Sequence, residues 1–98
     1  VLSAQPPSVE VTPLHEAQVP VAREARNVVA FLSAHGRATF AQLIEDARDT
    51  AVVVSRFLAI LELYRRRAIE FEQERALAPL QIVWNGIDPQ VDEWEEDA

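Results

Sequence analysis

The chain has 98 residues, enough for one domain, and its nine arginines and sixteen acids give a formal net charge of -7 at pH 7. Such a charge repels phosphate backbones, so independent binding to duplex DNA is disfavoured. The chain has no cysteine, and no apolar run approaches the roughly 20 residues of a membrane span. These features predict a soluble cytoplasmic protein with no disulfide and no membrane anchor. The absence of methionine indicates a piece of a longer protein or a processed form.

The two ends of the chain differ in composition from its middle. Three prolines interrupt residues 1–18, which show no helical or strand period and are expected to form an extended linker. Residues 88–98 are acidic with a single tryptophan, and they are expected to form a solvated, disordered tail. The folded domain is therefore predicted over residues 19–87.

Two helices are expected in the first half of this domain. Apolar residues recur at helical spacing from Val21 to Leu32, and Gly36 follows as a C-cap. Thr39 and Gln42 have the spacing of a capping box, which predicts a short second helix running to about Ala47.

The third expected helix starts from a cap at Asp49 or Thr50 and ends near the three arginines 65–67, whose charge complements the carbonyl end of the helix dipole. Its large apolar side chains span an arc of about 160°, whereas a helix packed on its own small domain needs roughly 100°. The excess must be exposed or covered by a partner. The arc comprises Val53, Val54, Phe57, Leu58, Ile60, Leu61 and Tyr64.

Alternation with period two follows in residues 68–74 and again in 80–84, which predicts a β-hairpin. The order helix, short strand, helix, helix, hairpin is that of a winged helix-turn-helix, an α+β fold. A helix that binds DNA in such a fold contacts bases and phosphates through polar side chains, and the third helix has few of them. The pattern favours a protein-binding module.

Three segments together form a specific pattern: Val53-Val-Ser-Arg-Phe-Leu-Ala-Ile-Leu-Glu-Leu-Tyr-Arg65, Ala68-Ile-Glu-Phe-Glu-Gln73 and Leu80-Gln-Ile-Val-Trp-Asn-Gly86. With weaker support from Leu14 onward, they resemble the kleisin subunits of SMC complexes. The similarity is greatest to the C-terminal winged-helix domain of the bacterial segregation and condensation protein ScpA, in its actinobacterial form.

The resemblance implies a non-enzymatic domain that docks on the cap face of the ATPase head of an SMC protein. This contact closes the SMC-kleisin ring in chromosome condensation and segregation, in the cytoplasm at the nucleoid. An ScpB-type partner is expected to bind other parts of the full-length protein, and DNA is held only indirectly by the assembled ring. Phe57 and Leu61 are the anchors that the resemblance implies, and both lie near the centre of the arc. The whole predicted partner interface is Val53, Val54, Phe57, Ile60, Leu61 and Tyr64.

The chain departs from the family pattern at two places. Arg67 stands where the family often has glycine, so the family's backbone would place a non-glycine residue at positive φ there. Leu77-Ala-Pro-Leu80 stands in the wing where the family usually has Phe-Gly-acid-Ile.

Two other functions remain open: a winged-helix transcription regulator that binds DNA, and a homodimerising winged-helix module. Neither catalysis nor a cofactor is expected, because the chain has no phosphate-binding glycine-rich loop and no nucleophile with a nearby base. No metal site is expected either, because His15 and His35 lack partners at ligand spacing.

Overall fold

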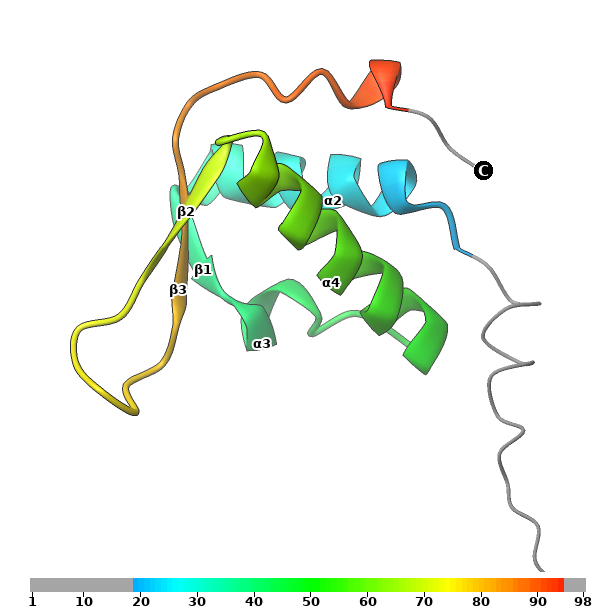
Figure 1. The fold of residues 1–98 in the computed structure, drawn as a ribbon. Helices are drawn as coiled ribbons and strands as arrows, with labels where there is room; N and C mark the ends of the chain where they lie inside the picture. The colour runs from blue at the N-terminus through cyan, green and yellow to red at the C-terminus, as the bar shows by residue number, and fades with distance from the viewer. Residues whose placement is uncertain (1–18, 95–98) are drawn as a thin grey trace, which may run out of the picture.

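Three α-helices, a short 3-10 helix and a three-stranded antiparallel sheet form the described part of the chain, residues 19–94, in the computed structural model (Figure 1). The class is therefore α+β, as the sequence predicts, and the arrangement is compatible with a winged helix. The expected linker 1–18 and residues 95–98 lie outside the described residues. The elements are, in order, α2 (Val21–His35), β1 (Arg37–Thr39), α3 (Phe40–Leu43), α4 (Thr50–Arg65), β2 (Ile69–Glu72), β3 (Gln81–Trp84) and the 3-10 helix η2 (Val91–Glu93).

The sheet has the order β1-β3-β2, with β3 in the centre and antiparallel to both neighbours. β2 and β3 form the expected hairpin, and the residues between them are its wing. Ile82 of β3 lies opposite Ala38 of β1 and Phe71 of β2, so these three side chains share the face that packs on the helices. The opposite face is exposed and carries an ion pair between Arg37 and Glu72 (3.4 Å).

Local hydrogen bonds set the ends of the helices near α3. The capping box is confirmed, with Gln42 N donating to Thr39 Oγ1 (3.1 Å) and Thr39 N donating to Gln42 Oε1 (2.9 Å). α3 ends at Leu43 rather than near Ala47. One reason is that Arg56 donates from Nη1 to the carbonyl oxygen of Leu43 (2.7 Å), which satisfies an acceptor at the end of the helix without another turn. Asp49 caps α4 as expected.

The C-terminus of α4 closes in a Schellman motif. Ala68 N donates to Leu63 O (3.0 Å) and Arg67 N donates to Tyr64 O (2.9 Å). Arg67 has φ 66°, so it occupies the left-handed position that glycine usually takes. The positive φ expected if the chain keeps the family's backbone at this junction is therefore present, although the residue is arginine.

The core lies between α2, α4 and the inner face of the sheet. Alanines at several of its positions leave room for close approach of the two helices. No helix in residues 19–94 is long and apolar enough to cross a membrane. The buried apolar residues are Ala22, Ala25, Val28, Leu32, Ala38, Leu43, Ala59, Ile60, Leu63, Ala68, Ile69, Ile82, Val91 and Trp94.

The segment after β3 runs back over α2 (Figure 1), so the expectation of a solvated tail from residue 88 is wrong as far as residue 94. Val91 and Trp94 are buried in the same core as the helices. Trp94 donates from Nε1 to the carbonyl oxygen of Pro89 (2.9 Å), and the guanidinium of Arg66 lies 4.6 Å from its ring centroid. The segment after β3 is acidic overall, but Val91 and Trp94 are spaced so that both side chains are buried on one side of it.

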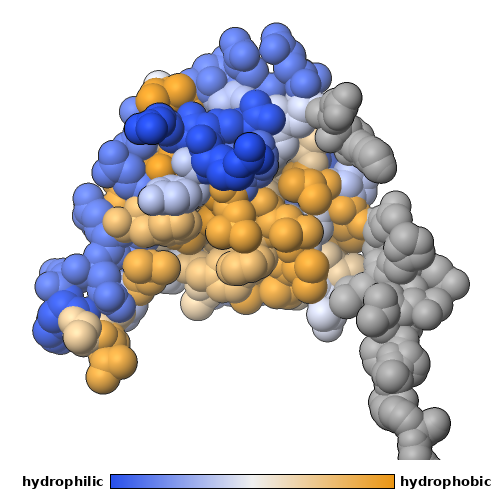
Figure 2. Space-filling model, viewed as in Figure 1, coloured by the Kyte–Doolittle hydropathy of each residue, from blue (hydrophilic) through white to orange (hydrophobic). Residues whose placement is uncertain are grey.

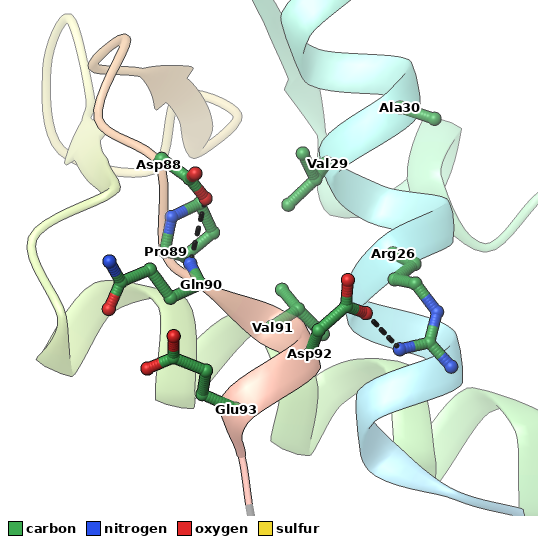
Figure 3. Close-up of a pocket in the computed structure, with 9 residues that line it drawn as sticks. All are labelled: Arg26, Val29, Ala30, Asp88, Pro89, Gln90, Val91, Asp92 and Glu93. Atoms are coloured by element: carbon green, nitrogen blue, oxygen red, sulfur yellow. Dashed lines mark hydrogen bonds and ion pairs between the residues drawn. The ribbon is translucent and has the colours of Figure 1, made fainter.

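The acids of this segment stay in water. Figure 3 shows Asp92 beside Arg26 of α2, and their ion pair measures 3.2 Å between exposed side chains. Such a pair contributes little to stability. Burial of Val91 and Trp94 is therefore what holds the segment on α2.

Replacing Arg67 by glycine is expected to raise the free energy of unfolding by roughly 0.5 to 1 kcal/mol, because glycine adopts positive φ without a steric penalty. The greater freedom of glycine in the unfolded chain offsets part of the gain. Arg67→Ala is the matched control, because it removes the same charge and keeps the strain. Chemical denaturation of the three proteins measures the difference, and a glycine variant less stable than the alanine variant would contradict the expectation.

Candidate partner-binding surface

The exposed side of α4 carries large apolar side chains, unlike that of an ordinary surface helix, and its buried side includes polar residues. Its buried residues include a serine, an arginine and an alanine: Ser55, Arg56, Ala59, Ile60 and Leu63. The opposite face carries five large apolar side chains that are 38 to 50% exposed and fall within an arc of about 120°. We call these five residues the α4 face: Val54, Phe57, Leu58, Leu61 and Tyr64.

Most of the interface that the sequence predicts lies on or beside this face. Phe57 and Leu61 are near its centre, and Val53 is half-buried at its margin. Ile60 is the exception, because it is 2% exposed and belongs to the core. Leu58 lies on the face but is not part of the predicted interface. The helical period groups these residues correctly, but it does not tell where along the apolar arc the core begins.

Two aromatic contacts hold the α4 face against the rest of the domain. Phe57 meets Phe40 edge to face, with ring centroids 5.9 Å apart, and Tyr64 stacks on Phe71 of β2 at 4.7 Å. Phe40 and Phe71 are themselves half-buried, so they widen the apolar surface on either side of the helix. The face is thus ordered before a partner arrives.

Figure 2 shows this surface as a continuous apolar area bordered above by hydrophilic residues. The C-terminal end of α4 is polar, and two of its arginines are occupied within the helix. Arg65 Nη1 and Arg66 Nε each donate to the carboxylate of Glu62 at 2.8 Å. Burial opposes ionisation of Glu62, but the two arginines outweigh it and hold its pKa below the usual value. The single Glu62 carboxylate thus offsets part of the positive charge of arginines 65–67.

A buried ionic cluster holds α4 on α2 and α3. Arg56 Nε donates to Glu24 Oε1 of α2 (2.9 Å), and both side chains are almost fully buried. Its Nη1 donates to Leu43 O and to Asp46 Oδ1 (2.6 Å), so one guanidinium joins three segments. Ser55 beside it donates to Val19 O (2.8 Å), ahead of α2. We call Glu24, Asp46 and Arg56 the ionic cluster.

The charged state of the cluster follows from these contacts. Burial disfavours the Glu24 carboxylate, but hydrogen bonds from Arg56, Asn27 and Arg23 outweigh it and lower the pKa of Glu24. The hydrogen bond from Arg56 likewise lowers the pKa of Asp46. Burial of Arg56 is opposed by its two carboxylate partners, which raise its pKa. All three groups are therefore ionised at neutral pH.

Other candidate sites in the described residues are weaker. His35 stacks on Phe31 and its Nδ1 lies 2.9 Å from Phe31 O, so it caps the end of α2. An open depression between α2 and the C-terminal segment is lined by three carboxylates and the paired Arg26 (Figure 3). Within residues 19–94 no group of three histidines, cysteines or acids is placed to hold a metal ion. The depression offers neither a metal site nor an unpaired cation for an anionic ligand.

Comparison with known proteins identifies a family for the chain. The family profile described as "Segregation and condensation protein ScpA" matches residues 3–85, which is most of the chain. Searches of the curated proteins and of the solved structures gave no match.

Replacing Arg56 by methionine is expected to destabilise the domain by about 3–5 kcal/mol, because the Glu24 carboxylate is left buried without its partner. The double variant Glu24→Met/Arg56→Met is expected to recover most of that loss, since no unpaired charge remains. Asp46→Asn is the control, because Asp46 is the exposed partner of Arg56. It is expected to lower the free energy of unfolding by about 1 kcal/mol or less, since the Asp46 side chain is 80% exposed. Urea denaturation measures all four proteins, and a double variant no better than the single one would refute this account.

Proposed function

Because this chain belongs to the family of segregation and condensation protein ScpA, we propose that it docks on the ATPase head of an SMC protein through the α4 face. The family supplies a structural, non-enzymatic kleisin subunit in chromosome segregation and condensation, in complexes with SMC and ScpB. Our proposal is more specific. The chain is the C-terminal winged-helix domain of an actinobacterial kleisin, it contacts the cap face of the head, and it acts at the nucleoid in the cytoplasm.

One observation carries the proposal: five large apolar side chains are exposed side by side on one helix of a small domain. An exposed apolar patch of this kind marks a site of protein interaction. Phe57 and Leu61 lie near its centre, where water is excluded most completely when a partner covers the face. They are therefore the expected anchors, with Val53, Val54, Leu58 and Tyr64 around them. The hairpin supplies a second contact.

The domain's charge supports a protein partner over DNA. A net charge of -7 opposes binding to phosphate backbones. In a transcription regulator the third helix would offer polar side chains to the bases, whereas the exposed side of α4 is apolar. DNA is then held by the assembled ring, with the kleisin closing it.

Self-association through the α4 face is the second candidate, because the same exposed side chains suit a copy of this chain. The solution mass of the 98-residue chain distinguishes the two. A monomer that binds the SMC head supports the adaptor, while a stable dimer that buries Phe57 and Leu61 supports self-association.

Phe57→Arg and Leu61→Arg are each expected to abolish binding to the SMC head of the same organism while the domain still folds. An arginine at a half-exposed position is tolerated in the free domain, but it costs several kcal/mol when a partner buries it unpaired. Ala34→Arg is the matched control, because Ala34 is exposed on α2, away from the face. Pull-down gives binding and circular dichroism gives folding.

The three variants separate the possible outcomes. Folded Phe57 and Leu61 variants that bind as well as wild type would place the docking surface elsewhere. Unfolded variants would make those side chains part of the core, in which case Leu58→Ser and Tyr64→Ser test the same face more gently.

The isolated chain is expected to show no sequence-specific binding to duplex DNA at physiological salt, because Arg65 and Arg66 are paired with Glu62 and the overall field is negative. Any attraction should be weak and should vanish as salt is raised. A footprint on a defined sequence at sub-micromolar concentration would favour the transcription regulator instead.

A further inference from the structure

The tip of the wing presents a leucine in a way that is unfavourable in two respects. Leu77 is 99% exposed, and its φ of 71° is left-handed. That conformation is strained for a residue with a Cβ. Glycine would avoid the strain, and a polar residue would avoid the exposed apolar surface. An outlier of this kind points to a role that the isolated domain does not reveal.

The turn that carries Leu77 is held in one geometry. Ala78 N donates to Arg75 O (3.0 Å), and the side chain of Gln73 donates from Nε2 to Ala78 O (2.7 Å). Only the third residue of this turn, Leu77, has positive φ, the pattern of a type II turn, where glycine is usual. A side chain presented by an ordered turn loses little backbone freedom when it binds.

The wing tip and the α4 face are visible in the same view of the molecule. Figure 2 shows apolar residues at the end of the wing, separated from the large apolar area by hydrophilic residues. Leu80, at the other end of the loop, is 45% exposed. One partner that covers the α4 face can therefore also reach the tip.

Charged side chains of β2 and of the residues just after it limit what the tip of the wing can contact. Glu70, Glu72 and Glu74 are exposed there. Arg37 pairs with Glu72 at 3.4 Å and Arg75 pairs with Glu74 at 3.5 Å, so three carboxylates face two arginines and the strip stays net negative. These carboxylates repel the phosphates of DNA and of anionic lipids. They attract lysine and arginine side chains on a protein.

We infer that Leu77 is a second anchor, which inserts into an apolar socket rimmed by basic residues on the SMC head that the α4 face covers. The inference rests on the proposed function and adds a residue, a socket and a charge requirement to it. On this inference the free domain carries a strained, exposed leucine at position 77 because that leucine is buried when the SMC head is bound.

The test compares Leu77→Gly with wild type in the 98-residue chain, by calorimetric binding to the SMC head and by thermal melting. The glycine variant is expected to melt at the same temperature or higher, because the strain is relieved, and to bind about 10- to 100-fold more weakly, because a buried leucine is lost. Leu77→Asn tolerates positive φ and should lose the same affinity. Leu77→Met keeps an apolar side chain and should bind within a few-fold of wild type.

Each outcome is decisive. A glycine variant that binds as tightly as wild type overturns the anchor and leaves the α4 face untouched. If wild type does not bind the head at all, the proposed function fails, and the anchor fails with it. A wild-type dimer that Leu77→Gly converts to a monomer would place the socket on a second copy of this chain, which also overturns the inference.

Discussion

The bond between Arg56 and Glu24 determines which side of α4 faces the core. Both side chains are almost fully buried, and the guanidinium also reaches Leu43 O and Asp46. If α4 turned about its axis so that Phe57 and Leu61 entered the core, Ile60 and Leu63 would leave it, and large apolar side chains would again be buried. That arrangement would leave the Glu24 carboxylate in the interior without a partner, which costs several kcal/mol. The ionic cluster therefore disfavours an alternative that apolar burial alone would permit, and the apolar face stays exposed.

A buried ion pair of this kind is weak support for stability, because desolvation offsets much of the attraction. Its better-attested use is to specify one arrangement among several of similar apolar content, as polar residues do in coiled coils. In this domain the small residues Ala25 of α2 and Ala59 of α4 sit in the same core as the pair. The orientation of α4 about its axis therefore has two consequences: small residues pack closely on its core side, and aromatic side chains are exposed on its other side.

Much of the architecture could be predicted because its signals are local. Gly36, the Thr39 and Gln42 capping box, and Asp49 each act within a few residues, so the helix limits near them followed from the sequence. The positive φ expected if Arg67 kept the family's backbone is present, although arginine alone would not indicate it. The period of α4 likewise grouped the exposed side chains of its outer face.

What escaped prediction depends on partners distant in the chain. No local pattern indicates that Arg56 is buried; it is buried because its partner Glu24 lies 32 residues away in sequence and beside it in space. Ile60 was placed at the interface because its place in the arc did not show that it lies on the core side. Charge likewise suggested that residues 88–94 were solvated, although Val91 and Trp94 reach the core and Arg66 covers the tryptophan.

The contact between Arg66 and Trp94 ties the C-terminal segment to the end of the helix that bears the α4 face. Arg66 lies over the Trp94 ring and also donates to Glu62, so its guanidinium is held from both sides. Glu62 in turn holds Arg65, which keeps two positive charges at the polar border of the apolar surface. Such a border is the arrangement expected around a docking patch, where a polar rim surrounds residues that a partner desolvates. The C-terminal segment thus contributes to the edge of the proposed binding surface as well as to the core, because it helps position the arginine that forms part of that edge.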